Sequence, residues 1–80
     1  MGLANELAEQ GVRVNAVAPG LVRTGIRVVA GDPDRLQRLL LRVPMARAGE
    51  PGEVAHSIAW LLGSEAAYVT GTSLLVAGGL

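Results

Sequence analysis

Few side chains in this 80-residue sequence could carry acid–base or nucleophilic chemistry. His56 is the only histidine and Tyr68 the only tyrosine, and the chain contains neither cysteine nor lysine. A thiol nucleophile, a disulfide framework and a thiolate metal site are therefore excluded. His56 could be a general base, but its helical spacing from Glu53 and Trp60 favours a solvated helix flank. We predict no catalytic residue and no metal ligand in this sequence.

Charge and hydropathy narrow the classes of partner. Seven arginines balance seven acidic residues, so the formal net charge is zero. Arg35, Arg38 and Arg42 could form a basic stripe, but on a neutral chain such a stripe is more typical of a solvated helix face near a helix C-terminus. No apolar run approaches the ~18 residues of a membrane span, and the first residues lack the features of a secretory signal. We expect a cytoplasmic protein with no nucleic-acid partner and no membrane.

Two apolar runs, the first of them rich in β-branched residues, and three helical patterns account for most of the chain. Gly11 suits the end of the first helix, and Pro19-Gly20 stops the first strand. Asp32-Pro33 is a strong helix start, because an N-cap side chain precedes a proline at the first helical position. Pro44 ends this second helix, and Gly63 ends the third. The predicted elements, in the order helix, strand, helix, helix and strand, are residues 3–10, 12–18, 32–43, 50–62 and 72–77.

Apolar residues recur on one face of each predicted helix. Trp60 and Tyr68, the only aromatic residues, are expected in the core or in an interface. The apolar faces comprise Leu3 and Leu7 in the first helix, Leu36, Leu39, Leu40 and Val43 in the second, and Val54, Ile58, Leu61 and Leu62 in the third.

The two predicted strands should be parallel, because helices connect them through a right-handed crossover. A parallel sheet is stable when both faces are covered and neighbouring strand positions are filled. Two strands cannot achieve this, and each keeps an edge that can pair with another strand. The sequence therefore predicts an α/β fold that is incomplete as a domain.

Several segments together resemble the C-terminal part of a short-chain dehydrogenase/reductase. Residues 13–20 (RVNAVAPG), with Val22 and Thr24, are similar to that family's sixth strand and cofactor loop. Residues 44–51 (PMARAGEP) are similar to the entry into its next helix. Residues 60–65 (WLLGSE) and 68–71 (YVTG) continue the match, and 76–79 (VAGG) resemble its closing strand, where many members have Asp at the position of Ala77. The resemblance covers essentially residues 1–80 as one C-terminal segment of a Rossmann-like, doubly wound parallel sheet.

The resemblance implies a place beside the nicotinamide ring of NAD or NADP. Pro19 and Gly20 would turn the chain there, and the Val22 backbone would bond the carboxamide. Thr24 would contact the carboxamide or the nearby phosphate, and residues 25–43 would form a mobile lid over the substrate. This placement is physically reasonable, because ligands of open α/β sheets bind beyond the C-terminal strand ends and glycine lets the backbone approach a flat ring.

The same resemblance sets limits on activity. The family's Gly-rich phosphate turn, its cofactor-selecting residue and its Ser, Tyr and Lys catalytic residues lie upstream of the match. Tyr68 has no lysine to lower its pKa. Asn15 matches a strand position of structural role rather than the family's catalytic Asn. Arg47 also matches a structural position, where a local ion pair is expected. The 80-residue chain is therefore predicted to be inactive alone.

Three functional hypotheses remain open. The chain is a segment of an NAD(P)-dependent oxidoreductase of an alcohol or carbonyl substrate, a non-catalytic module that associates with full-length relatives, or a truncated relic. The resemblance also implies a homo-oligomer that forms through the last helix and the last strand.

Overall fold

A computed structural model describes residues 2–23 and 34–80. Its elements follow the predicted order, with one added 3₁₀ turn, η1, after the third helix. The elements are α1 (Gly2–Ala8), β1 (Ala16–Pro19), α2 (Arg35–Leu40), α3 (Pro51–Leu62), η1 (Ser64–Ala66) and β2 (Ser73–Val76).

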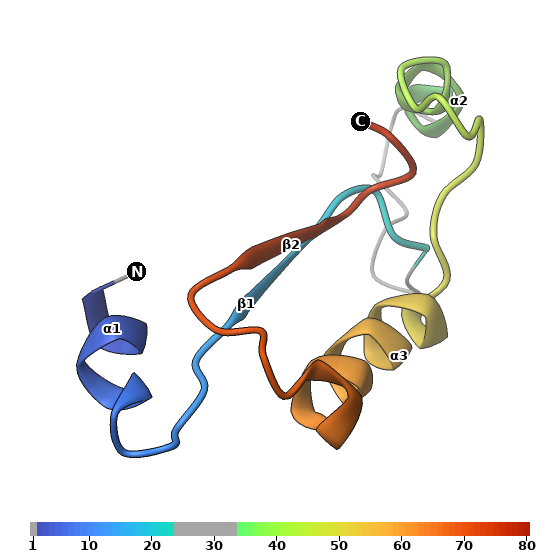
Figure 1. The fold of residues 1–80 in the computed structure, drawn as a ribbon. Coiled ribbons are helices and arrows are strands. Elements are labelled where there is room, and N and C mark those ends of the chain that lie inside the picture. The colour runs from blue at the N-terminus through green and yellow to red at the C-terminus, as the bar shows by residue number, and fades with distance from the viewer. Residues whose placement is uncertain (1, 24–33) are drawn as a thin grey trace.

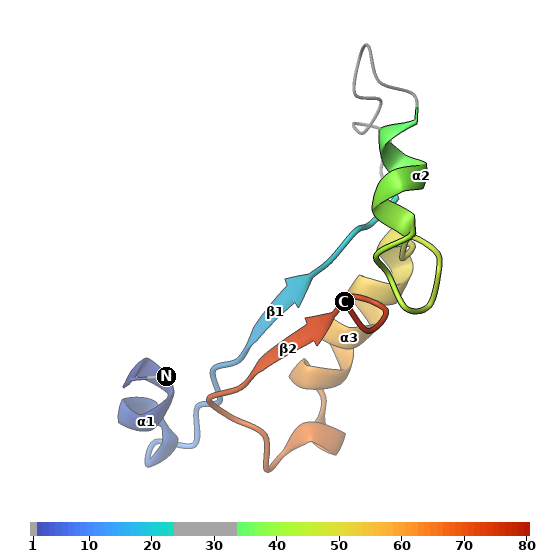
Figure 2. The same ribbon diagram turned by 90° about the horizontal axis from the view of Figure 1, so that it is seen from above.

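The two strands form a parallel two-stranded sheet, as predicted. Ala16 pairs with Ser73 at one end of the sheet, and Pro19 pairs with Val76 at the other. Both strands point toward the end of the molecule that carries α2, whereas α1 lies at the opposite end (Figures 1 and 2). Helix α3 packs against β1. The C-terminal ends of both strands, where ligands of α/β sheets bind, therefore lie together.

Polar side chains at the start of β1 fix the chain segment that leads into β2. Asn15 Nδ2 donates to the carbonyl of Val69 at 2.9 Å, and Asn15 Oδ1 accepts from the Thr72 N–H at 3.1 Å. Arg13 Nη1 donates to the carbonyl of Leu61 at 2.7 Å, near the end of α3. The structural role predicted for Asn15 is confirmed, because its amide bonds the backbone of the segment that leads into β2.

The helix boundaries agree in part with the sequence pattern. Gly11, with φ of 76°, follows α1 in the left-handed region, and Gly63 follows α3 as predicted. The predicted start of the second helix at Asp32-Pro33 lies outside the described residues. Helix α2 ends at Leu40 rather than at Val43. The next turns are tighter, and Pro44 disfavours the helical region for the residue before it.

The buried core is small and contains little bulky material. The molecule exposes 5949 Å², although a compact chain of this mass would expose about 4,500 Å². Its radius of gyration is 15.9 Å, compared with about 12 Å for a compact chain of this length. The predicted incomplete packing is therefore visible in the shape. The buried residues in the described part are Ala4, Val43, Ala48, Leu61 and Ala66.

Several residues expected in the core or in an interface are exposed in this chain. Trp60 is 46% exposed and Tyr68 is fully exposed, so neither contributes to the core of this chain. Within α3, Leu61 is buried, but Leu62 is 78% exposed. Within α1, Ala4 rather than Leu3 is buried. Across residues 2–23 and 34–80, no helix is long and apolar enough to cross a membrane.

Candidate functional site

The turn after β1 is held against the end of β2. The Gly20 N–H donates to the carbonyl of Val76 at 3.0 Å. A Cβ atom at position 20 would lie 2.6 Å from the Cβ of Ala77 and 2.9 Å from its Cα. Packing against Ala77 therefore requires a glycine here, whether or not a ring approaches the turn. The sequence accounted for Gly20 by the turn and by the approach of the ring, and it did not predict this contact.

The chain beyond the turn pairs with a loop that precedes α3. Gly49 donates its N–H to the carbonyl of Leu21 at 2.9 Å and accepts the N–H of Arg23 at 2.8 Å. Val22 and Gly49 thereby form an isolated parallel bridge. The N–H and C=O of Val22 take no part in this bridge, since its two bonds come from the residues on either side. Within the described residues, no hydrogen bond to either Val22 group occurs.

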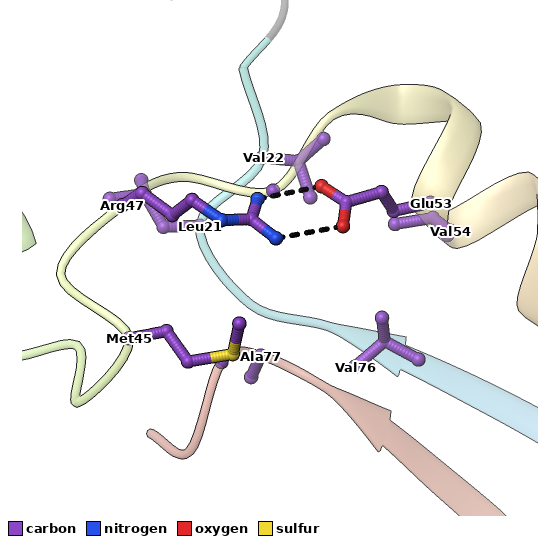
Figure 3. Close-up of a pocket in the computed structure, with 10 residues that line it drawn as sticks. Leu21, Val22, Met45, Arg47, Glu53, Val54, Val76 and Ala77 are labelled. Atoms are coloured by element: carbon purple, nitrogen blue, oxygen red, sulfur yellow. Dashed lines mark hydrogen bonds and ion pairs between the residues drawn. The ribbon is translucent and has the colours of Figure 1, made fainter.

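The loop before α3 is folded around the carboxylate of Glu53. Arg47 Nη1 donates to Oε1 at 2.7 Å, and Nη2 donates to Oε2 at 2.9 Å (Figure 3). The backbone N–H of Glu50 donates to the same Oε1 at 2.9 Å, which satisfies a free N–H at the start of the helix. The local ion pair expected at Arg47 is confirmed.

These contacts shift the ionisation of both partners. The Arg47 hydrogen bonds and the Glu50 N–H lower the pKa of Glu53 to about 2, and the Glu53 carboxylate raises the pKa of Arg47. A folded-state pKa below the unfolded value adds stability above the unfolded pKa, and this stability is lost as pH falls through the folded pKa. The pair therefore stays ionised at neutral pH, and the small contribution that water screening leaves to this exposed pair is lost between about pH 4.5 and pH 2.

Two glycines at the C-terminal end of the sheet fix the segment that follows α2. Gly78 and Gly79 have φ of 64° and 96°, a region that favours glycine. A Cβ at Gly78 would lie 2.9 Å from Val43 Cγ1, and one at Gly79 would lie 3.0 Å from Pro44. The Met45 N–H donates to the Gly78 carbonyl at 3.0 Å. The end of β2 therefore sets where the chain leaves α2.

Two cavities flank residues 20–22. The first, of about 130 Å³, lies on the side of the Arg47–Glu53 pair (Figure 3). The second, of about 290 Å³, lies between the turn and the C-terminal end of α2 with the segment that follows it, and its lining is mostly apolar with one arginine. Leu21, Val22, Met45, Arg47, Gly49, Glu53, Val54, Val76, Ala77 and Gly78 line the first, and Gly20, Leu21, Leu39, Arg42, Val43 and Leu80 line the second.

The structure brings together most of the predicted cofactor positions. Pro19 ends β1, Gly20 makes the turn, and Val22 follows in the bridged segment. Thr24 and the first part of the predicted lid lie outside the described residues. The sequence did not predict Gly49 as part of this site, because only the folded chain places it beside Val22. Over residues 2–23 and 34–80, no three His, Cys, Asp or Glu side chains group as metal ligands.

Known proteins similar to this chain cover nearly all of it. The family model described as enoyl-(acyl carrier protein) reductase matches residues 2–80. The uncharacterized oxidoreductase YgfF of Escherichia coli is 46% identical over 78 residues, which are 98% of this chain and 32% of that protein. Glucose 1-dehydrogenase 2 of Bacillus subtilis is 45% identical over 78 residues, which are 98% of this chain and 30% of that protein. The chain thus spans about a third of the length of these curated relatives.

Solved structures of similar proteins also cover nearly all of this chain. A 3-oxoacyl-[acyl-carrier protein] reductase from Brucella melitensis superposes with a TM-score of 0.91 at 43% identity, over 99% of this chain and 29% of that one. A second structure of a Brucella melitensis 3-oxoacyl-[acyl-carrier protein] reductase, with bound NAD, has a TM-score of 0.87 at 42% identity, over 99% of this chain and 28% of that one. The predicted α/β class is confirmed, since the chain matches part of a Rossmann-like fold.

Proposed function

This chain belongs to the short-chain dehydrogenase/reductase family, and we propose that it supplies the nicotinamide-facing loop of an NAD(P)-dependent oxidoreductase acting on an alcohol or carbonyl group. The cofactor, when bound, supplies or accepts the hydride. This chain binds and orients the cofactor through Pro19, Gly20, Val22 and Thr24. The observation that carries the proposal is the Val22 backbone, whose N–H and C=O take no part in the bridge to Gly49.

The donor and acceptor of Val22 suit a planar carboxamide. An amide of this kind offers one acceptor oxygen and two N–H donors, so it pairs with a peptide group that presents both a donor and an acceptor. The segment also follows a strand whose C-terminal end lies at the ligand-binding edge of an α/β sheet. The apolar cavity of about 290 Å³ beside Gly20 is the proposed place of the substrate.

In this proposal, the residues that transfer the proton of the reaction are not part of this chain. The exposed Tyr68 is the only phenol, and the sequence has no lysine to lower its pKa. Residues 64–72, which contain Tyr68, precede β2, so they lie at the sheet end opposite to Gly20. The Gly-rich turn and the Ser, Tyr and Lys residues would come from a part of the enzyme that precedes this segment.

A hybrid enzyme tests the proposal directly. In this hybrid, residues 2–80 replace the segment that they match in Bacillus subtilis glucose 1-dehydrogenase 2. We expect it to bind NADH or NADPH with a Kd within about 10-fold of the unmodified enzyme, a difference of about 1.4 kcal/mol. Fluorescence titration measures the Kd, and circular dichroism checks the fold. A hybrid that folds without binding cofactor, or that does not fold, contradicts the proposal.

A matched pair of proline substitutions in the hybrid separates the two backbone roles. Val22→Pro removes an N–H outside the bridge, so we expect the cofactor Kd to rise about 3- to 10-fold, since a hydrogen bond contributes about 1 kcal/mol. Arg23→Pro removes the N–H that bonds Gly49, so it should also lower the melting temperature. Titration and thermal melts measure both effects. Equal losses of stability with no change in Kd for Val22→Pro would assign Val22 to the fold alone.

Association with other chains is the second candidate. Leu62 in α3 is 78% exposed and Leu75 in β2 is 61% exposed, and each strand of the sheet pairs with one other strand among the described residues. Such surfaces favour contact with another chain. The proposal therefore includes a homo-oligomer through the last helix and last strand, or a non-catalytic module bound to full-length relatives. Co-purification with a full-length relative would favour the module, and an aggregating product would favour a relic. The cytoplasmic location stays a prediction.

A further inference from the structure

The segment that carries Val22 is attached to a loop with a defined internal scaffold. Both oxygens of Glu53 accept hydrogen bonds from Arg47, and Oε1 also accepts the N–H of Glu50. These three bonds bring residues 47 and 50 to one carboxylate. The bidentate geometry restricts the guanidinium plane as well as its distance. The loop conformation therefore depends on one side chain of α3.

Gly49 lies between Arg47 and Glu50 in this loop, and it links the loop to the proposed cofactor-binding segment, residues 21–23. It bonds Leu21 through its N–H and Arg23 through its C=O. A second link runs in parallel, since Arg23 Nε lies 3.4 Å from Glu50 Oε1. A shift of residues 47–50 that keeps these bonds therefore moves residues 21–23. Arg47, Glu53 and Val22 all line the smaller cavity, and Figure 3 shows them among its lining residues.

The exposure of the pair indicates what it contributes. The Arg47 and Glu53 side chains are 49% and 44% exposed. Ion pairs this accessible contribute little to the free energy of unfolding, because water screens them. The two parallel hydrogen bonds of this pair are therefore better explained by the conformation that they impose on the loop than by added stability. We propose that Arg47 and Glu53 are positioning residues that set the Val22 backbone for the cofactor, an inference that rests on the proposed function.

The inference predicts that substitutions of the pair change the cofactor KM of the hybrid but not its substrate KM. Arg47→Gln and Glu53→Gln should each raise the cofactor KM by about 3- to 10-fold, since a displaced segment weakens about one hydrogen bond. The substrate KM and the melting temperature should change little. The double variant should be no worse than either single one, because both remove the same pair. Glu65→Gln, which removes an exposed charge from η1, is the matched control and should leave every value unchanged.

Two further variants keep the test decisive if a glutamine variant folds poorly. Arg47→Lys retains the charge but not the two parallel bonds, so the cofactor KM should still rise. The exchange Arg47→Glu with Glu53→Arg can restore the ion pair but not the bond from the Glu50 N–H, because a guanidinium has no acceptor, so it should recover only part of the loss. Steady-state kinetics with varied cofactor and thermal melts measure these effects.

The outcomes separate this inference from the proposed function. An unchanged cofactor KM in the glutamine variants and in Arg47→Lys overturns the positioning role, even when the unsubstituted hybrid is active. A parallel fall of kcat, affinity for both substrates and melting temperature also overturns it, because a merely structural role gives that result. An unsubstituted hybrid that folds but does not bind cofactor removes the proposed function, and this inference with it.

Discussion

Gly20→Ala in the hybrid is expected to lower the free energy of unfolding by about 1–3 kcal/mol, the usual cost of overpacking a close contact. The new methyl group would lie 2.6 Å from the Cβ of Ala77 and 2.9 Å from its backbone Cα. Neither atom is the end of a flexible side chain, so the backbone itself must shift. Gly20→Val adds two more carbon atoms and should be worse. Chemical denaturation measures the loss.

Two matched variants show whether the contact is the cause. Gly52→Ala makes the same change within α3, where no atom lies within 4 Å of the added Cβ, so it should stabilise by about 0.5–1 kcal/mol. Ala77→Gly removes the nearer of the two atoms and should recover part of the Gly20→Ala loss. Additive effects of Gly20→Ala and Ala77→Gly would contradict the contact as the cause.

The isolated 80-residue chain is expected to show no turnover of NADH, NADPH, NAD or NADP and no cooperative unfolding transition. The described core comprises five residues, three of them alanine, whereas large apolar residues such as Leu41 and Leu62 are exposed. A small core supplies little of the free energy that offsets chain entropy. Tyr68 also has no lysine beside it for proton transfer.

Spectrophotometric assays and urea titration of the rigorously purified chain check this prediction. The hybrid enzyme, under the same conditions, is the positive control. Turnover by the isolated chain that Thr24→Ala or Gly20→Val abolishes would contradict the predicted inactivity. A single steep unfolding transition would contradict the account of an insufficient core.

Much of the fold follows from local sequence signals. Pro51 and Gly63 delimit α3 because proline suits a first helical turn and glycine suits the residue after a helix. The parallel pairing of β1 and β2 follows from the helices between them. The ion pair of Arg47 is also local, since its partner is six residues away.

The contacts that shape the site are not local, and the sequence alone could not predict them. Gly20 meets Ala77, and Gly49 bridges Val22, only after distant segments pair. Trp60 and Tyr68 are apolar enough for a core, but their exposure depends on which elements cover them. Periodicity predicts which face of a helix is apolar, and it does not predict whether another layer is present to bury that face.

The pairing of the two strands has an entropic consequence. Asn15 and Thr72, which bond across the sheet entry, are separated by 57 residues. Closing a flexible loop of that length costs about 4 kcal/mol. The bonds within α3 join near neighbours and close no such loop. Because the cost rises by only about 0.6 kcal/mol per doubling of length, insertions between the strands would hardly weaken their pairing. The number of residues between the two strands therefore has little effect on the stability of the sheet. The identity of those residues can instead be selected for ligand binding.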